Sequence, residues 1–180
     1  MIRNRRVLLV LGVFAALTAG AWWVQTSYAY VEAPMSLGAV VAQSTNVVLV
    51  RVESSDKQKN IIIYRKVKDI KGKHPTDVIK HNIGRGGLRP DEWKPPVEWA
   101  EPGKLAVFFH NGSASETCIG NYWYQCGGGG EWWNMTHGEP FLLRSYAGAI
   151  DKLAAAVTAI NAGQEVVVPC MVNGLSLIHI

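Results

Sequence analysis

The 180-residue sequence contains only three cysteines, Cys118, Cys126 and Cys170, and no two of them stand in CxxC spacing. Neither a zinc ribbon nor a thioredoxin-type redox site is therefore supported. In an exported chain, three cysteines predict one disulfide and one remaining thiol. We expect Cys118 to pair with Cys170, because that bond closes the larger loop. The alternative pair is Cys118 with Cys126.

Catalytic and metal-binding phrases are missing as well. The sequence has no GxSxG, no paired-carboxylate phrase and no histidines in HxH or HExxH spacing. We therefore expect His74, His81, His110 and His137 to be single hydrogen-bonded residues, and we predict no metal, no cofactor and no catalytic residue. Since catalytic triads assemble from distant segments, a secreted hydrolase with its catalytic residues on loops remains an alternative.

Long hydrophobic runs are absent except at the start of the chain, where residues 7–24 are apolar. Three arginines precede this run, and the small-x-small phrase Ser27-Tyr28-Ala29 follows it. This layout predicts a signal peptide over residues 1–29, with Tyr30 as the new N-terminus. The alternative is an uncleaved anchor over residues 7–24, which would make the chain a membrane-tethered envelope protein.

The expected mature chain has no strong excess of either charge. The sequence holds 18 Lys and Arg residues, of which three lie in the leader, so 15 remain against 14 Asp and Glu. A general preference for nucleic acid does not follow from this balance. The locally basic stretch from Lys57 to Lys94 is interpreted as a solvated face.

What the sequence does contain is a series of β-type segments. Alternation places Val48, Val50 and Val52 on one face of a strand and Val47 and Leu49 on the other. A second run over 61–70 breaks strict alternation, which predicts a bulge near residues 66–68. The remaining expected strands are 77–83, 104–111, two short strands from the segment 118–146, and a last strand over 165–170.

Two helices and one long loop complete the predicted order. A short helix is expected to begin after Ser36 and to run to Gln43. A second is expected over 149–162, because Ile150, Leu153, Val157 and Ile160 form an apolar stripe that Gly163 terminates. The segment "GRGGLRPDEWKPPVEWAEPGK", residues 84–104, is interpreted as a surface loop because glycine and proline are frequent in it.

These elements predict a mainly β protein: a small β-barrel like the oligonucleotide/oligosaccharide-binding (OB) fold, with one C-terminal amphipathic helix and a short N-terminal helix. Residues 30–174 would form its single domain. The final phrase "GLSLIHI" resembles translated adaptor sequence, so residues 175–180 are interpreted as a non-native or truncated tail.

Two phrases, "NVVLVRVESSDKQKNIIIYRKVKDIKGK" and "AEPGKLAVFF", resemble the N-terminal module of the tissue inhibitors of metalloproteinases and the wider netrin-like families. The resemblance covers roughly residues 36–126 and implies an OB-type barrel. Those inhibitors chelate the protease zinc through an N-terminal cysteine. Here the expected N-terminus is Tyr30 and the nearest cysteine is Cys118, so the resemblance does not imply metalloproteinase inhibition.

Three other phrases, "YRKVKDIKGKHP", "ETCIGNYWYQ" and "GQEVVVPCM", resemble a group of exported planctomycete proteins to which no activity is attached. This second resemblance is more specific than the first. It implies export, and it adds no substrate and no site.

Aromatic residues are concentrated in "CIGNYWYQCGGGGEWW", residues 118–133, and in the segment 84–104. Exposed rings of this kind can stack on sugars or on a partner's apolar groups. The function predicted is therefore an exported, non-enzymatic binding or adaptor module for an extracytoplasmic protein or glycan, not for nucleic acid. The candidate binding residues are Trp93, Trp99, Tyr122, Trp123, Tyr124, Trp132 and Trp133.

Overall fold

A computed structural model describes residues 36–84, 88–120, 122–138, 146, 148–172 and 175–179. Beyond Val168 it describes the backbone alone. The predicted signal peptide over residues 1–29 lies outside the described residues, as does Tyr30. Within the described part, no helix has the length and apolar character needed to cross a membrane.

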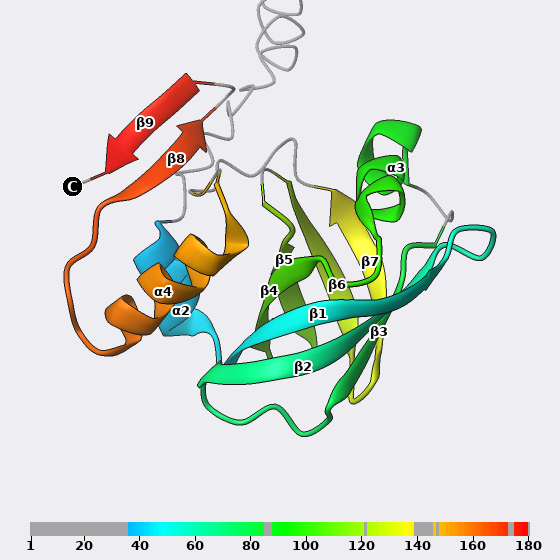
Figure 1. Cartoon of the computed structure of the whole chain (residues 1–180), viewed down its shortest axis with the longest axis horizontal. Coiled ribbons are helices and arrows are strands. Elements are labelled where there is room, and N and C mark those ends of the chain that lie inside the picture. The colour runs from blue at the N-terminus through cyan, green and yellow to red at the C-terminus, as the bar shows by residue number, and fades with distance from the viewer. Residues whose placement is uncertain are drawn as a thin grey trace, which may run out of the picture. The chain divides into compact units, whose positions relative to one another are not determined.

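The central structure is a closed β-barrel of seven strands in the order β1-β2-β3-β7-β6-β5-β4 (Figure 1). The pairing of β3 with β7 is parallel, and every other pairing in the barrel is antiparallel. This confirms the predicted small, mainly β barrel. The observed barrel has two more strands than the five of an OB-fold. The strands are β1 Asn46–Asp56, β2 Ile61–Lys71, β3 Val78–Asn82, β4 Leu105–Asn111, β5 Ala114–Cys118, β6 Trp123–Gly129 and β7 Trp132–Gly138.

Strand β1 shows why the sequence builds a barrel wall with two apolar faces. Val48, Val50 and Val52 point into the barrel and are buried, while Val47 packs outside, as the alternation predicts. The bulge in β2 is also confirmed. Leu49 pairs with Lys68 and Val50 with Lys66, so Val67 is the extra residue.

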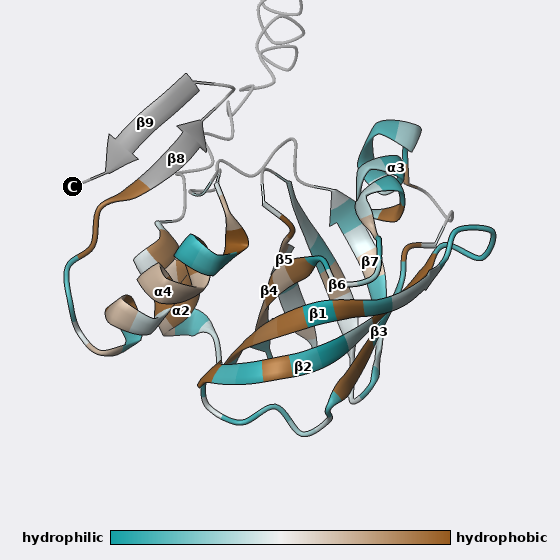
Figure 2. Ribbon diagram, in the orientation of Figure 1, coloured by the Kyte–Doolittle hydropathy of each residue, from teal (hydrophilic) through white to brown (hydrophobic). Residues whose placement is uncertain are grey.

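The wall therefore separates two hydrophobic layers. The interior layer fills the barrel with side chains that include Tyr64, Phe108 and Trp133. The outer layer, which includes Phe109 and Trp123, lies between the wall and two helices, α2 (Leu37–Gln43) and α4 (Ile150–Asn161). Figure 2 shows apolar residues along β1 and on both helices.

Both of these helices form where they were predicted. The Ser36 side chain accepts a hydrogen bond from the Ala39 amide at the start of α2. At the end of α2, the Lys71 ammonium donates to the carbonyls of Val41 and Ala42 at 2.6 and 3.1 Å. Helix α4 buries Leu153 and Val157, and Gly163 follows it at φ +76°.

The predicted loop over residues 84–104 is wrong, because Pro90–Trp99 form helix α3. Pro90 occupies the first helical position, where a missing N–H costs nothing. Pro96 has no N–H to give to the carbonyl of Glu92, but the Tyr122 hydroxyl donates to that carbonyl at 2.7 Å. The helix is thus stabilised by a residue just before β6, which lies far along the chain and which local sequence patterns do not reveal.

The segment after α4 forms its own two-stranded sheet, in which β8 (Val168–Val172) pairs with β9 (Leu175–His179). The predicted last strand over 165–170 thus begins later, and the backbone of the predicted tail takes part in the pairing. Cys170 belongs to β8, but its side chain lies outside the described part of the structure. Its predicted disulfide with Cys118 stays a prediction.

Candidate functional site

A hollow on the described part of the barrel lies beside α2, on the outer face of β4, β5, β6 and β7. Its volume is about 320 Å³, at the lower end of the range of small-molecule sites. We call it the α2 cleft. It is lined by Val40, Gln43, Ser44, Phe109, Asn111, Ala114, Ser115, Glu116, Gln125, Cys126, Gly127 and Thr136.

Strand register explains both the walls and the floor of the α2 cleft. Phe109, Glu116 and Gln125 form one row across β4, β5 and β6, since Phe109 pairs with Glu116 and Glu116 with Gln125. In the parallel row beside it, Ala114 pairs with Gly127. Cross-strand neighbours in such rows lie about 5 Å apart. Because alanine and glycine have little or no side chain, the second row is hollow.

The first two glycines of "GGGG" have distinct structural roles. Gly127 forms part of the floor of the α2 cleft, where an added Cβ would lie 3.4 Å from the Thr136 methyl group. Gly128 passes so close to the backbone of Trp132 and Trp133 that a side chain would clash with it. Gly129 and Gly130 have open space where a side chain would be.

The surface of the α2 cleft is mainly apolar, with a carboxylate and several uncharged polar groups among its lining residues. The Gln125 side-chain amide donates a hydrogen bond to the Glu116 carboxylate at 3.0 Å, which orients both groups. Among the described lining residues, Glu116 is the only side chain that is charged at neutral pH. Gln43, Asn111 and Thr136 add uncharged hydrogen-bonding groups. The arrangement suits a ligand that both donates and accepts hydrogen bonds.

A second group of polar side chains is sealed inside the barrel. The His81 Nδ1 atom and the Tyr64 hydroxyl each form a hydrogen bond with the Tyr124 hydroxyl, at 2.8 and 2.9 Å. Burial lowers the pKa of His81 to about 3, so the ring is neutral at pH 7. Burial also raises the pKa of the Cys126 thiol, and the charge of Glu116 adds to that rise. Neither group is ready for acid–base or thiolate chemistry.

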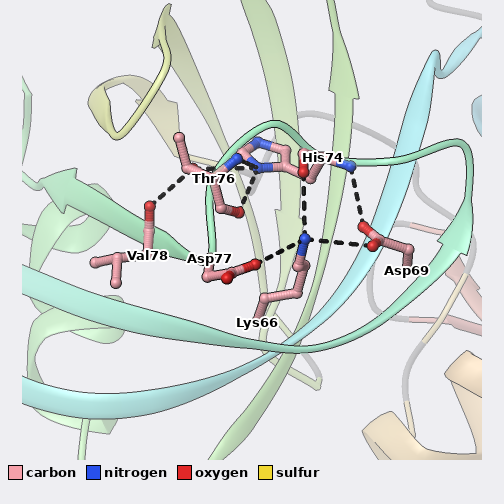
Figure 3. Close-up of polar contacts among 6 residues, drawn as sticks. All are labelled: Lys66, Asp69, His74, Thr76, Asp77 and Val78. Carbon is pink, nitrogen blue, oxygen red and sulfur yellow. Dashed lines mark hydrogen bonds and ion pairs between the residues drawn. The ribbon is translucent and has the colours of Figure 1, made fainter.

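A third group of polar side chains surrounds Lys66 between β2 and β3 (Figure 3). The Lys66 ammonium contacts the Asp77 and Asp69 carboxylates at 2.9 and 3.3 Å and donates to the His74 carbonyl at 3.2 Å. The His74 ring contacts Thr76, and burial lowers the pKa of His74. These contacts tie the β2–β3 connection together, so we assign this group a structural role.

Two of the four histidines considered in the sequence lie together, since the ring centres of His74 and His110 are 5.4 Å apart. His74, His81 and His110 each form a hydrogen bond through one ring nitrogen. His137 lies 3.7 Å from Glu92, whose carboxylate also accepts hydrogen bonds from the amides of Arg89 and Gly138. No group of three or more metal-ligating side chains gathers within the described residues.

The seven predicted aromatic binding residues do not share one surface. Trp123, Tyr124 and Trp133 are buried, and Trp123 stacks on Phe109 at 5.5 Å between ring centres. Trp132 is 49% exposed, with the Lys80 ammonium 5.3 Å from its ring centre. The other three, Trp93, Trp99 and Tyr122, pack partly buried against the interior layer.

The two cysteines with described side chains lie on opposite sides of the wall. Cys118 belongs to the outer layer and Cys126 to the interior layer. The alternative disulfide between them is therefore not formed, and both side chains are buried.

No motif in the sequence marks Glu116 and Gln125 as binding residues. Alternation alone indicates that each lies on one face of its strand, and it does not reveal which residue pairs across. The pairing of "ASETC" with "WYQCG" would have been the signal.

Comparison with known proteins adds no relative: no protein family, curated protein or solved structure matches the chain.

Proposed function

We propose that the chain is a non-enzymatic binding module that holds a small saccharide ligand in the α2 cleft. The observation that carries the proposal is the row of Glu116 and Gln125 beside the hollow formed by Ala114 and Gly127. Carboxylate and amide groups bind the hydroxyls of sugars because they offer donors and acceptors in fixed directions. Phe109 adds an apolar element to the same row.

The chemistry of the other polar groups also supports binding rather than catalysis. His81 and Cys126 are buried inside the barrel, and their pKa shifts favour the neutral forms. Lys66 is engaged by two carboxylates. These three candidates for an acid, a base or a nucleophile are thus either buried in the core or engaged in ion pairs.

Export belongs to the same proposal. It rests on the leader pattern of residues 1–29 and on the resemblance to exported proteins, and the ligand would then be an extracytoplasmic glycan. The resemblance to metalloproteinase inhibitors and netrin-like modules remains a proposal about ancestry. The seven-strand barrel is compatible with that ancestry, and the proposal carries no inhibitory activity.

Two glycine variants in one strand test the site. Gly127→Val fills the floor of the α2 cleft, whereas Gly129→Val on the same strand meets open space. We expect chemical-shift titration with a panel of neutral, amino and acidic sugars to show binding to the unmodified chain and to Gly129→Val. Gly127→Val should bind roughly tenfold more weakly or not at all, because its side chain occupies the ligand volume.

Three outcomes would contradict the proposed function. Failure of every sugar in the panel to shift the α2 cleft signals would remove the site. Equal binding by both glycine variants would place the ligand elsewhere. Turnover of a hydrolase substrate panel by the purified chain would favour the enzyme alternative.

A further inference from the structure

We infer that the saccharide in the α2 cleft is one unit of a longer glycan chain, which leaves the cleft across β6 and β7 and stacks on the exposed ring of Trp132. This inference rests on the proposed function and specifies the ligand that the same site takes. It follows from the strand register, which joins the floor of the cleft to the outer face of β7.

The floor of the α2 cleft continues beyond the cleft as one row across the barrel wall. Gly127, which lines the cleft, pairs with Ala114 of β5 on one side and with Asn134 of β7 on the other. Asn134 in turn pairs with Asn82 of β3, and the Asn82 side-chain amide donates to the Asn134 side-chain oxygen at 3.0 Å. The row therefore presents oriented, uncharged amides, which can donate to and accept from sugar hydroxyls.

An exposed tryptophan ring stands beside this row. Trp132 lies two residues before Asn134 on the same face of β7, and it is 49% exposed. The Lys80 ammonium lies 5.3 Å from the ring centre and is itself paired with the Glu131 carboxylate at 2.8 Å, so it helps to orient the ring. A large apolar ring that is oriented and open to water offers a stacking surface to the apolar face of a sugar.

Strand β6 places no side chain between the cleft and this ring. Its outward-facing positions there are Gly127 and Gly129, and Gly129 pairs with Trp132. A side chain added at Gly129 would meet nothing within 4 Å. A ligand can therefore lie directly against the backbone of β6. We call this surface the glycine track, and its members are Gly127, Gly129, Trp132, Asn134 and Asn82.

The extent and charge of the glycine track favour a neutral chain of linked sugars. From Ala114 to Trp132 a ligand crosses two strand spacings of about 4.8 Å each and follows β7 for two residues of about 3.3 Å each, which is more than one sugar ring covers. None of the five track residues is charged, and the neighbouring Lys80 is paired with Glu131. A protein partner would need about 800 Å² of continuous surface with an apolar centre, and a single exposed ring between amides and glycines does not provide it.

The test compares single sugars with their oligomers on the full chain, by calorimetry and chemical-shift titration. The probes are glucose, cellotetraose, N-acetylglucosamine and chitotetraose. We expect at least one tetramer to bind roughly tenfold more tightly than its single unit, because the contact with the Trp132 ring is added. The single sugars should shift signals of the α2 cleft alone, and the tetramer should shift those of the cleft and of the glycine track.

Two substitutions separate the glycine track from the α2 cleft. Trp132→Ala should lower the affinity for the tetramer roughly tenfold, to that of the single sugar, whereas Trp132→Phe keeps a ring and should recover part of the loss. Gly129→Val places a side chain on the track and should weaken the tetramer alone. Val67→Ala is the control, because it shortens another exposed apolar side chain, on β2, and it should change neither affinity.

The outcomes separate this inference from the proposed function. If the single sugars bind the α2 cleft and neither tetramer binds more tightly, or if the gain survives Trp132→Ala, the inference is wrong and the sugar site stands. Tetramers that shift the track signals and leave the cleft signals unchanged would overturn both the joined path and the cleft as the site. If no probe shifts either set of signals, both statements are wrong.

Discussion

At the scale of single residues, His81 shows what burial inside the barrel does to an ionisable group. Its Nδ1 atom has the Tyr124 hydroxyl as a partner, but nothing near it compensates a positive charge. The pKa of His81 therefore falls to about 3 in the folded protein, against about 6.5 in an unfolded chain. Protonation of the His81 ring therefore destabilises the folded state.

The first prediction follows from that difference. Between the two pKa values the unfolded chain binds more protons than the folded one, so the stability falls as the pH decreases from about 6.5 to 3. His81 alone contributes up to roughly 4–5 kcal/mol to this loss. Urea unfolding at pH 7.5, 6, 5 and 4 should show the decline, and His81→Gln should make it less steep, leaving the part that comes from His74, whose pKa burial also lowers.

His137→Gln is the matched control, because His137 is 42% exposed. The free energy of unfolding of this variant should vary with pH as that of the unmodified chain does. If His81→Gln and His137→Gln respond to pH in the same way, the buried ring is not the source of the decline.

At the scale of secondary-structure elements, α3 is the one that sequence patterns misjudged. Two consecutive prolines, Pro95 and Pro96, lie inside the helix. The Tyr122 hydroxyl supplies the hydrogen bond that Pro96 cannot make to Glu92. A carboxylate–amide contact between Glu92 and Gly138 at 3.4 Å further joins the helix to β7.

The second prediction concerns the hydrogen bond from the Tyr122 hydroxyl to the Glu92 carbonyl. Tyr122→Phe leaves the Glu92 carbonyl without that donor and should lower the free energy of unfolding by about 1–3 kcal/mol. In a Pro96→Ala background the new amide of residue 96 can take over the bond. Tyr122→Phe should then cost clearly less, as measured by urea unfolding of the four chains in a double-mutant cycle. Additive losses would contradict the assigned role of Tyr122.

At the scale of the whole molecule, the barrel wall decides which thiols are available. Cys126 faces the interior layer and Cys118 the layer under the helices, so neither is accessible in the folded chain. The predicted disulfide of Cys118 with Cys170 would connect the barrel to the strand pair that follows α4.

The third prediction tests that connection. We expect no reaction of the oxidised, folded protein with Ellman's reagent, because burial raises the pKa of Cys126 and excludes the reagent. After unfolding in urea without reductant, one thiol per chain should react. Three reactive thiols would contradict the disulfide, and rapid reaction of the folded chain would contradict the interior position of Cys126.

The sequence by itself determined the elements whose signals are local. The alternation of Val48, Val50 and Val52 fixes which face of β1 is buried, and the stripe that includes Leu153 and Val157 defines α4. Both patterns are periodic along one segment, so they need no knowledge of a partner.

Only the tertiary structure decided α3 and the α2 cleft. The helix depends on Tyr122, which lies 30 residues after Glu92, and the cleft depends on the register that sets Glu116 beside Gln125. Strand pairing and long-range hydrogen bonds join residues that are distant in the chain. Local propensity carries no record of those partners, because the free energy that selects them is gained only when the barrel closes.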